Sequence, residues 1–264
     1  MKVRAAGRGA CAHLLAKVQQ RLRDTQPIMA MIADKLQQVH ARIAGACRSA
    51  SRPVESVTLL VVSKTFGPDA VRAAVAAGEY RFGENYVQEG IDKIALLSDL
   101  RHRIEWHLIG PLQSNKTRGV AEHFDWVHSV DRLKTAQRLS EQRPAHLPAL
   151  QLCLQVNISG EASKSGLAAR DMAAVAQAVA ALPRVRLRGL MAIPEPAVGF
   201  EAQRAPHRAL RELFDSLNAQ GLGLDTLSIG MSADLEAAIA EGATMVRIGS
   251  AVFGERSLGD TTAA

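Results

Sequence analysis

An apolar run followed by a helical segment recurs about eight times along the chain, and this repeat most limits the fold. In the first copy, residues 57–64 have the length and β-branched content of a buried strand. The helix predicted after it begins at Pro68 and ends before Gly78. Similar units follow without a linker, which predicts a single-domain α/β fold, a (β/α)8 TIM barrel. A doubly wound open sheet is the alternative.

The same patterns predict where the individual elements lie. The expected strands cover residues 57–64, 80–83, 104–109, 126–130, 150–158, 185–193, 226–229 and 245–248. Apolar residues at helical spacing predict an extra helix from Met31 to about Ser49, before the first strand. We also expect a helix from Gly110 towards Phe124, and Asp131 as the N-cap of the helix 132–142.

Residues 1–28 form a basic leader that we expect to lie outside the fold, with the barrel over residues 29–264. The leader holds six Lys or Arg residues and one Asp, and so contributes five of the six net positive charges. It resembles a transit peptide, but translation starting at Met29 or Met31 explains it better. The rest of the chain is nearly neutral, which argues against a nucleic-acid partner.

The cysteines and histidines argue against a disulfide-linked protein and against a metal-binding protein. Cys11, Cys47 and Cys153 are odd in number and lack CxxC spacing, which favours a reducing cytoplasm. His107 shares a strand face with Glu105, but the histidines show no metal-ligand spacing, so no metal is expected. No apolar stretch approaches the length of a membrane span, so we expect no membrane association.

Lys64 is the unexpected residue in the first strand. A lysine that closes a buried strand lies at the rim where parallel α/β folds position their chemistry. Partial desolvation there would leave a fraction of neutral amine, which Schiff-base formation with an aldehyde requires. Taken alone, the residue is better explained as a strand-end lysine that extends to water.

Two small-residue loops after the seventh and eighth strands add a second signal. Gly230-Met231-Ser232 and Gly249-Ser250 open helices at the strands where barrels commonly hold a phosphate. A single glycine-serine pair is more often a turn, but here two occur at matching strands. A Schiff-base lysine and a phosphate site in one barrel mouth suggest pyridoxal 5′-phosphate.

Longer motifs support this interpretation. They are Val62-Ser63-Lys64-Thr65, residues 82–89 (FGENYVQE), residues 106–116 (WHLIGPLQSNK), Ser163-Lys164-Ser165-Gly166, residues 189–193 (GLMAI) and residues 228–232 (SIGMS). In this order they resemble the YggS/PROSC family of pyridoxal phosphate homeostasis proteins, from about residue 31 to Gly254.

The resemblance implies a barrel of the alanine-racemase N-terminal type, with pyridoxal phosphate bound covalently as an aldimine on Lys64. It implies cofactor contacts from residues at the barrel mouth, which are Asn85, Asn157, Met191, Ser228, Gly230, Met231, Ser232, Arg247, Gly249 and Ser250. Among these, Arg247 would face the pyridine nitrogen, Met191 would lie near the ring, and Asn85 and Asn157 would line the mouth. Ser250 stands where relatives often carry threonine and keeps the hydroxyl. Lys164 matches a second family lysine, which could also be a solvated loop charge.

The expected function is a cofactor carrier rather than an enzyme. Arg247 can only donate hydrogen bonds, so it favours an unprotonated pyridine and a weaker electron sink. A racemase also needs a second base, which alanine racemases supply as a tyrosine from an additional domain. We expect no such domain after the eighth strand, and the only tyrosines are Tyr80 and Tyr86.

We therefore expect a cytoplasmic monomer that buffers pyridoxal phosphate for vitamin B6 and amino-acid homeostasis, with apoenzymes as its candidate transient recipients. The alternatives are an amino-acid racemase, or a Schiff-base aldolase that uses Lys64 without the cofactor.

Overall fold

The computed structural model describes residues 29–159 and 165–254. The basic leader, Cys11 and Lys164 lie outside the described residues, so the expectations for them stay predictions.

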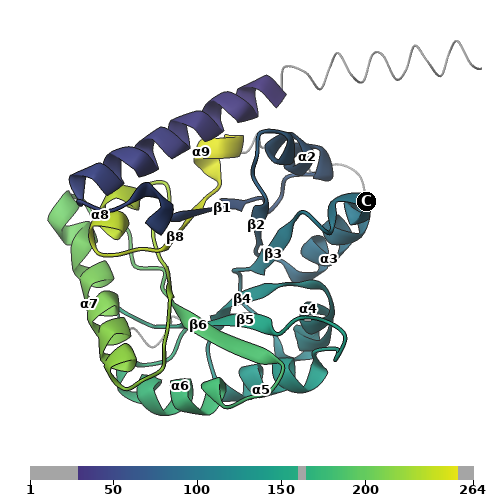
Figure 1. Ribbon diagram of the computed structural model, residues 1–264, viewed down its shortest axis with the longest axis vertical. Helices are drawn as coiled ribbons and strands as arrows, with labels where there is room; N and C mark the ends of the chain where they lie inside the picture. Colours follow the sequence, from purple (N-terminus) through teal and green to yellow (C-terminus); the bar gives the residue numbers. More distant parts are fainter. Residues whose placement is uncertain (1–28, 160–164, 255–264) are drawn as a thin grey trace, which may run out of the picture.

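Eight parallel strands close into a barrel in which each strand pairs with the next and β8 pairs with β1 (Figure 1). The strands are β1 (Thr58–Val62), β2 (Arg81–Glu84), β3 (Glu105–Leu108), β4 (Trp126–Val130), β5 (Leu150–Gln155), β6 (Val185–Met191), β7 (Thr226–Ser228) and β8 (Met245–Ile248). Val61 lies opposite Ile248 in the closing pair. The predicted barrel is therefore confirmed, and the open sheet is excluded.

A ring of helices covers the outside of the barrel (Figure 1). They are α2 (Pro68–Ala76), α3 (Val87–Leu96), α4 (Thr117–His123), α5 (Leu133–Gln142), α6 (Met172–Ala180), α7 (Phe200–Ala219), α8 (Leu235–Ala240) and the short α9 (Ser250–Phe253). Pro68 stands in the first turn of α2, and Gly78 just beyond its end has a φ of 101°. Both residues occupy the helix-end positions that their backbone preferences favour.

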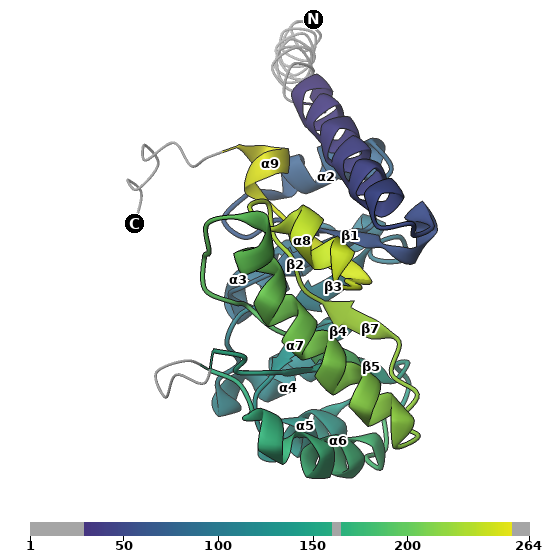
Figure 2. The same cartoon turned by 90° about the vertical axis from the view of Figure 1, so that its left-hand side faces the viewer.

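An additional helix over residues 29–49 crosses the end of the ring beside α8 and α9 (Figure 2). Its inward face consists of the residues that the helical spacing predicted, which are Ile32, Leu36, Val39, Ile43 and Cys47, all at most 3% exposed. On its flank, Arg42 forms a 3.0 Å ion pair with Glu236 of α8. Burial of one apolar stripe thus fixes this helix on the barrel.

Two local predictions were wrong. The helix expected from Gly110 begins only at Thr117, because residues 111–113 are irregular and Ser114–Lys116 form a 3-10 turn. Asp131 does not cap α5. Its carboxylate instead accepts a 3.0 Å hydrogen bond from Nε of Arg132, the residue that occupies the N-cap position. The partner of this carboxylate is thus the adjacent guanidinium and not the backbone amides of the helix.

Within the described ranges, no helix is both long enough and apolar enough to cross a lipid bilayer.

Candidate functional site

Parallel strands direct all their carboxyl ends to one mouth of the barrel, so residues that follow the strands meet there. Lys64 follows β1, Asn85 follows β2 and Asn157 follows β5. Arg247 lies within β8, and the Ser232 and Ser250 loops follow β7 and β8. Because β8 pairs with β1, the Ser250 loop adjoins the strand that ends at Lys64.

The residues that follow β1, Ser63 to Thr65, form a turn that we call the Lys64 turn. A buried ionic network that joins β1, β2 and α3 supports this turn. Nζ of Lys93 lies 2.6 Å from the Glu84 carboxylate, 3.1 Å from the Glu89 carboxylate and 2.8 Å from the Ser63 carbonyl. The Ser63 hydroxyl donates to Glu84 at 2.6 Å. Glu84 is fully buried and Lys93 is 4% exposed. Burial raises the pKa of Glu84, and the charge of Lys93 opposes that rise.

The residue after Lys64 is held in an uncommon backbone conformation. Thr65 has a φ of 67°, a region that β-branched residues rarely occupy. Its backbone N–H donates to the Glu89 carboxylate at 2.5 Å. Lys64 itself is half-buried between this strained turn and the mouth. The ionic network therefore fixes the backbone on both sides of Lys64.

Two hydroxyls converge at the loops after β7 and β8. Oγ of Ser232 and Oγ of Ser250 lie 3.3 Å apart. In the first loop, Asp234 accepts a 2.7 Å hydrogen bond from the Met231 backbone N–H, and Gly230 has a φ of 92°. In the second, a Cβ at Gly249 would lie 3.0 Å from the Val62 carbonyl oxygen, so only glycine fits without adjustment.

Arg247 is buried beside these loops and is held by three acceptors. Nη1 donates to the carbonyl and, at 2.9 Å, to the hydroxyl of Ser228, and Nη2 donates to the Ala192 carbonyl at 2.9 Å. Burial lowers the pKa of Arg247 to about 10, while the charge of Asp234 opposes that shift, so the guanidinium stays cationic at neutral pH. This arrangement gives the mouth a fixed donor of hydrogen bonds that cannot act as a base.

The remaining residues that the sequence predicted lie around this cluster. Met191 ends β6, fully buried, and packs with Trp126 and Cys153 inside the barrel. Ser228 ends β7 with its side chain fully buried. Asn85 and Asn157 are half-buried in the loops after β2 and β5. Direct contact between these residues and a cofactor stays a prediction.

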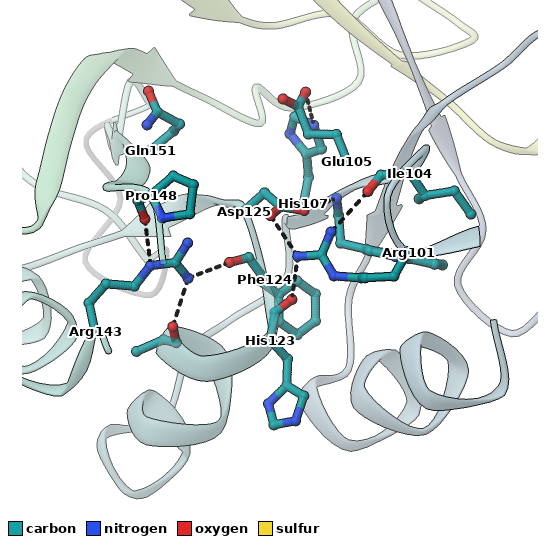
Figure 3. Close-up of polar contacts among 12 residues, drawn as sticks. Arg101, Ile104, Glu105, His107, His123, Phe124, Asp125, Arg143, Pro148 and Gln151 are labelled. Carbon is teal, nitrogen blue, oxygen red and sulfur yellow. Dashed lines mark hydrogen bonds and ion pairs between the residues drawn. The ribbon is translucent and has the colours of Figure 1, made fainter. Parts of the chain in front are cut away.

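A pocket of about 520 Å³ opens at the opposite, amino-terminal end of the barrel. Its arginines are occupied by protein partners, as Figure 3 shows for Arg101 and Arg143. Arg101 donates to Asp125 at 2.7 Å, Arg143 donates to the Ala121 and Phe124 carbonyls, and Arg188 binds Asp225 and stacks over Trp126. These arginines therefore serve structural contacts, and the pocket is not a candidate anion site.

Sequence reasoning missed Glu84 and Lys93 as supports of the Lys64 turn. A signal existed, because Lys93 falls beside Ile94 and three residues after Gly90, on the buried face of α3. A lysine on that face requires a buried partner.

Relatives with curated names match most of the chain. The chain is 62% identical to a protein of Pseudomonas aeruginosa named pyridoxal phosphate homeostasis protein, over 231 residues that make up 88% of this chain and 98% of the relative. It is 53% identical to the protein of that name from Escherichia coli K12, over 85% of this chain and 97% of the relative.

Solved structures with similar sequences and the same fold also match most of the chain. PipY of Synechococcus elongatus PCC7942 with pyridoxal phosphate (PLP) bound matches with a TM-score of 0.73 and 40% identity, over 84% of this chain and 100% of that chain. An unknown protein from Bifidobacterium adolescentis matches with a TM-score of 0.81 and 35% identity, over 86% of this chain and 96% of that chain. Alanine racemase from Corynebacterium glutamicum, at 17% identity and a TM-score of 0.66, covers 89% of this chain and 64% of that chain and shows the fold alone.

The family described as alanine racemase, N-terminal domain, matches residues 35–257. Together with the two bacterial relatives, this match shows that the chain belongs to the alanine racemase N-terminal domain family and, within it, to the pyridoxal phosphate homeostasis proteins.

Proposed function

We propose that the chain binds pyridoxal 5′-phosphate covalently and reversibly through Nζ of Lys64, and carries or buffers it in vitamin B6 and amino-acid homeostasis. Pyridoxal phosphate supplies an aldehyde that combines with amines and a pyridine ring that can accept electron density. The names of the relatives and the PLP-bound PipY structure support the choice of cofactor.

The observation that carries the proposal is the adjacency of β1 and β8 at the mouth. In pyridoxal phosphate the aldehyde and the phosphate-bearing methylene occupy neighbouring ring carbons. An amine and a phosphate site must therefore adjoin, as Lys64 and the Ser232–Ser250 hydroxyl pair do. The ring nitrogen lies across the ring from the aldehyde, and buried Arg247 supplies a donor beyond the phosphate loops.

The residues present fit this cofactor chemically. Hydroxyls and loop amides suit a phosphate dianion, and a half-buried lysine suits an aldehyde. Arg247 suits an unprotonated pyridine nitrogen, because a guanidinium only donates. A carboxylate at that position would instead keep the ring protonated and strengthen it as an electron sink. These residues thus favour binding of the cofactor over its use as an electron sink in catalysis.

The racemase alternative depends on a second base at the mouth. Tyr86 is 56% exposed and follows β2 on the mouth side. Tyr80 precedes β2, at the other end of the barrel, and its hydroxyl accepts a 2.9 Å hydrogen bond from Arg103. Of the two tyrosines, Tyr86 is therefore the candidate base, and Tyr86→Phe is the variant that tests it.

Absorption spectroscopy of the purified protein, before and after borohydride, tests the proposal. We expect visible absorption from the lysine-linked cofactor, and reduction should fix the label on the peptide that contains Lys64. A colourless protein that still processes a sugar phosphate through Lys64 would favour the aldolase. Release of the cofactor to an apoenzyme is measured by the activity that the apoenzyme gains.

Replacement of Arg247 by glutamate tests the electronic part of the proposal. A carboxylate stabilises the protonated pyridine that a guanidinium opposes, so the pKa of the ring nitrogen should rise. We expect a shifted absorption spectrum, with racemisation of alanine and serine still negligible because the substitution adds no base on the second face of the substrate carbon. The measurements are a spectral pH titration and amino-acid racemisation assays with α-proton exchange in heavy water.

Arg247→Gln serves as the neutral control, because it retains a donor without the charge and buries more easily than glutamate. Robust, saturable racemisation by the wild type that disappears in Lys64→Ala would overturn the carrier proposal in favour of the racemase.

A further inference from the structure

A continuous row of polar contacts runs through the barrel interior behind Arg247. Its first contact joins Nη1 of Arg247 to Oγ of Ser228 at 2.9 Å, and the second joins that Oγ to Nδ1 of His128 at 2.8 Å. The third joins Nε2 of His128 to Nδ1 of His107 at 2.9 Å. The fourth joins Nε2 of His107 to the Glu105 carboxylate at 3.0 Å (Figure 3). The row thus connects β8, β7, β4 and β3.

The middle of this row is isolated from water. Ser228, His128 and His107 are fully buried, whereas the Glu105 side chain is 39% exposed at the amino-terminal end. The ring of Trp126 stacks on His107, with centroids 5.3 Å apart and an interplanar angle of 14°. Buried polar groups are costly unless they are hydrogen-bonded, so the contacts in this row offset the cost of burying these groups.

With both imidazoles neutral, the carboxylate end fixes the direction of every hydrogen bond. Glu105 can only accept, so His107 donates to it from Nε2 and keeps Nδ1 as an acceptor. His128 then donates from Nε2 to Nδ1 of His107, and its own Nδ1 accepts from the Ser228 hydroxyl. The guanidinium of Arg247 can only donate, so the Ser228 oxygen accepts from it. Both rings are thus neutral Nε2–H tautomers.

The electrostatics of the row agree with this proton order. Burial lowers the pKa of His107, against the attraction of Glu105. Burial also lowers the pKa of His128 well below its ordinary value, and the positive charge of Arg247 acts in the same direction. Burial opposes ionisation of Glu105, but the hydrogen bond from His107 and the charge of Arg81 lower its pKa to about 2. The ends are charged and the centre is neutral.

We propose that His128, His107 and Glu105 are positioning residues for Arg247, which act through Ser228 to hold the guanidinium against the cofactor ring. This inference rests on the proposed function, in which Arg247 faces the pyridine nitrogen. Because the Ser228 proton is donated to His128, the lone pairs of the Ser228 oxygen are available to Arg247. The guanidinium is thereby held by acceptors behind it. Among the described residues no hydrogen bond is found to its Nε, which leaves that donor for the ring.

The first test needs no cofactor. Side-chain ¹H–¹⁵N NMR of the cofactor-free protein reports which ring nitrogen of each histidine carries the proton, with assignments from His107→Phe and His128→Phe. We expect both residues to be neutral Nε2–H tautomers at neutral pH, because burial lowers the pKa of both imidazoles. An Nδ1–H tautomer or a protonated ring at either position under these conditions would show that the proposed order of hydrogen bonds is wrong.

The second test uses the spectral pH titration of the cofactor-bound protein. In His128→Phe, Arg247 is held less firmly and opposes pyridine protonation less. The midpoint of pyridine protonation in the spectral titration should therefore rise by about half to one pH unit. This is the size expected for the loss of one hydrogen bond. Ser228→Ala should behave in the same way and Ser228→Thr, which keeps the hydroxyl, should not. His123→Asn, in α4 outside the barrel, is the matched control.

The outcomes separate the two proposals. Correct tautomers with an unchanged midpoint in His128→Phe and Ser228→Ala would mean that the row only fills the barrel, and the positioning role would be wrong. If borohydride fails to label Lys64 in the wild type, the proposed function fails and the positioning role fails with it. The tautomers measured without cofactor would still decide whether the hydrogen-bond row exists.

Discussion

Replacing Lys64 with alanine is expected to abolish the visible absorption of the bound cofactor while the barrel stays folded. Lys64 is a half-buried rim residue, and its amine is the nucleophile that the proposed function requires. Borohydride labelling of the variant should fall at least about tenfold, to background. The free energy of unfolding should change by no more than about 0.5 kcal/mol, as is usual when a side chain outside the core is truncated.

The matched control is Lys134→Ala, an exposed lysine on α5, which should retain the full spectrum. Mass spectrometry of the reduced wild type locates the label directly. A label found mainly on Lys116 or Lys164 would show that the lysine after β1 is not the attachment site.

Replacing Lys93 with methionine should produce the largest loss of stability among these variants. Lys93 is the cation that compensates fully buried Glu84, and its removal leaves that carboxylate without a charge partner. Breaking a buried pair from one side costs about 3–5 kcal/mol. Urea denaturation should show a decrease of that size in the free energy of unfolding. The Lys64 turn should also loosen, because Lys93 binds the Ser63 carbonyl.

The pH dependence of this variant follows from Glu84. Burial raises the pKa of the carboxyl group above its value in the unfolded chain, so the folded variant takes up a proton as the pH falls. The loss of stability should therefore shrink as the pH is lowered from neutral through the raised pKa of Glu84.

The double variant Glu84→Gln with Lys93→Met should recover much of the loss, because it leaves no buried charge. Lys134→Met, at an exposed position of α5, controls for the loss of a helical lysine. A decrease below about 1 kcal/mol in Lys93→Met would show that the pair does not stabilise the fold.

The sequence determined the order of the elements, because strand and helix periodicity are local properties. The run that ends at Lys64, the Pro68 start of α2 and the apolar stripe of the first helix each carry their signal within a few residues. Lys64, Arg247 and Ser250 each lie at or near the end of a predicted strand. Once a closed parallel barrel was inferred, these strand ends had to meet at one mouth. Local rules failed where neighbours compete for a group, as at Asp131, whose carboxylate pairs with Arg132.

Only the tertiary structure decided which buried polar groups meet. Lys93 compensates Glu84 because α3 packs over the ends of β1 and β2. His107 and His128 stand 21 residues apart, and His128 and Ser228 stand 100 residues apart, yet barrel closure brings them into one hydrogen-bond row. Strand periodicity predicts which face a side chain occupies, but closure sets which strands face one another across the interior. The partners of Arg247 were therefore fixed by the barrel and not by its neighbours in the chain.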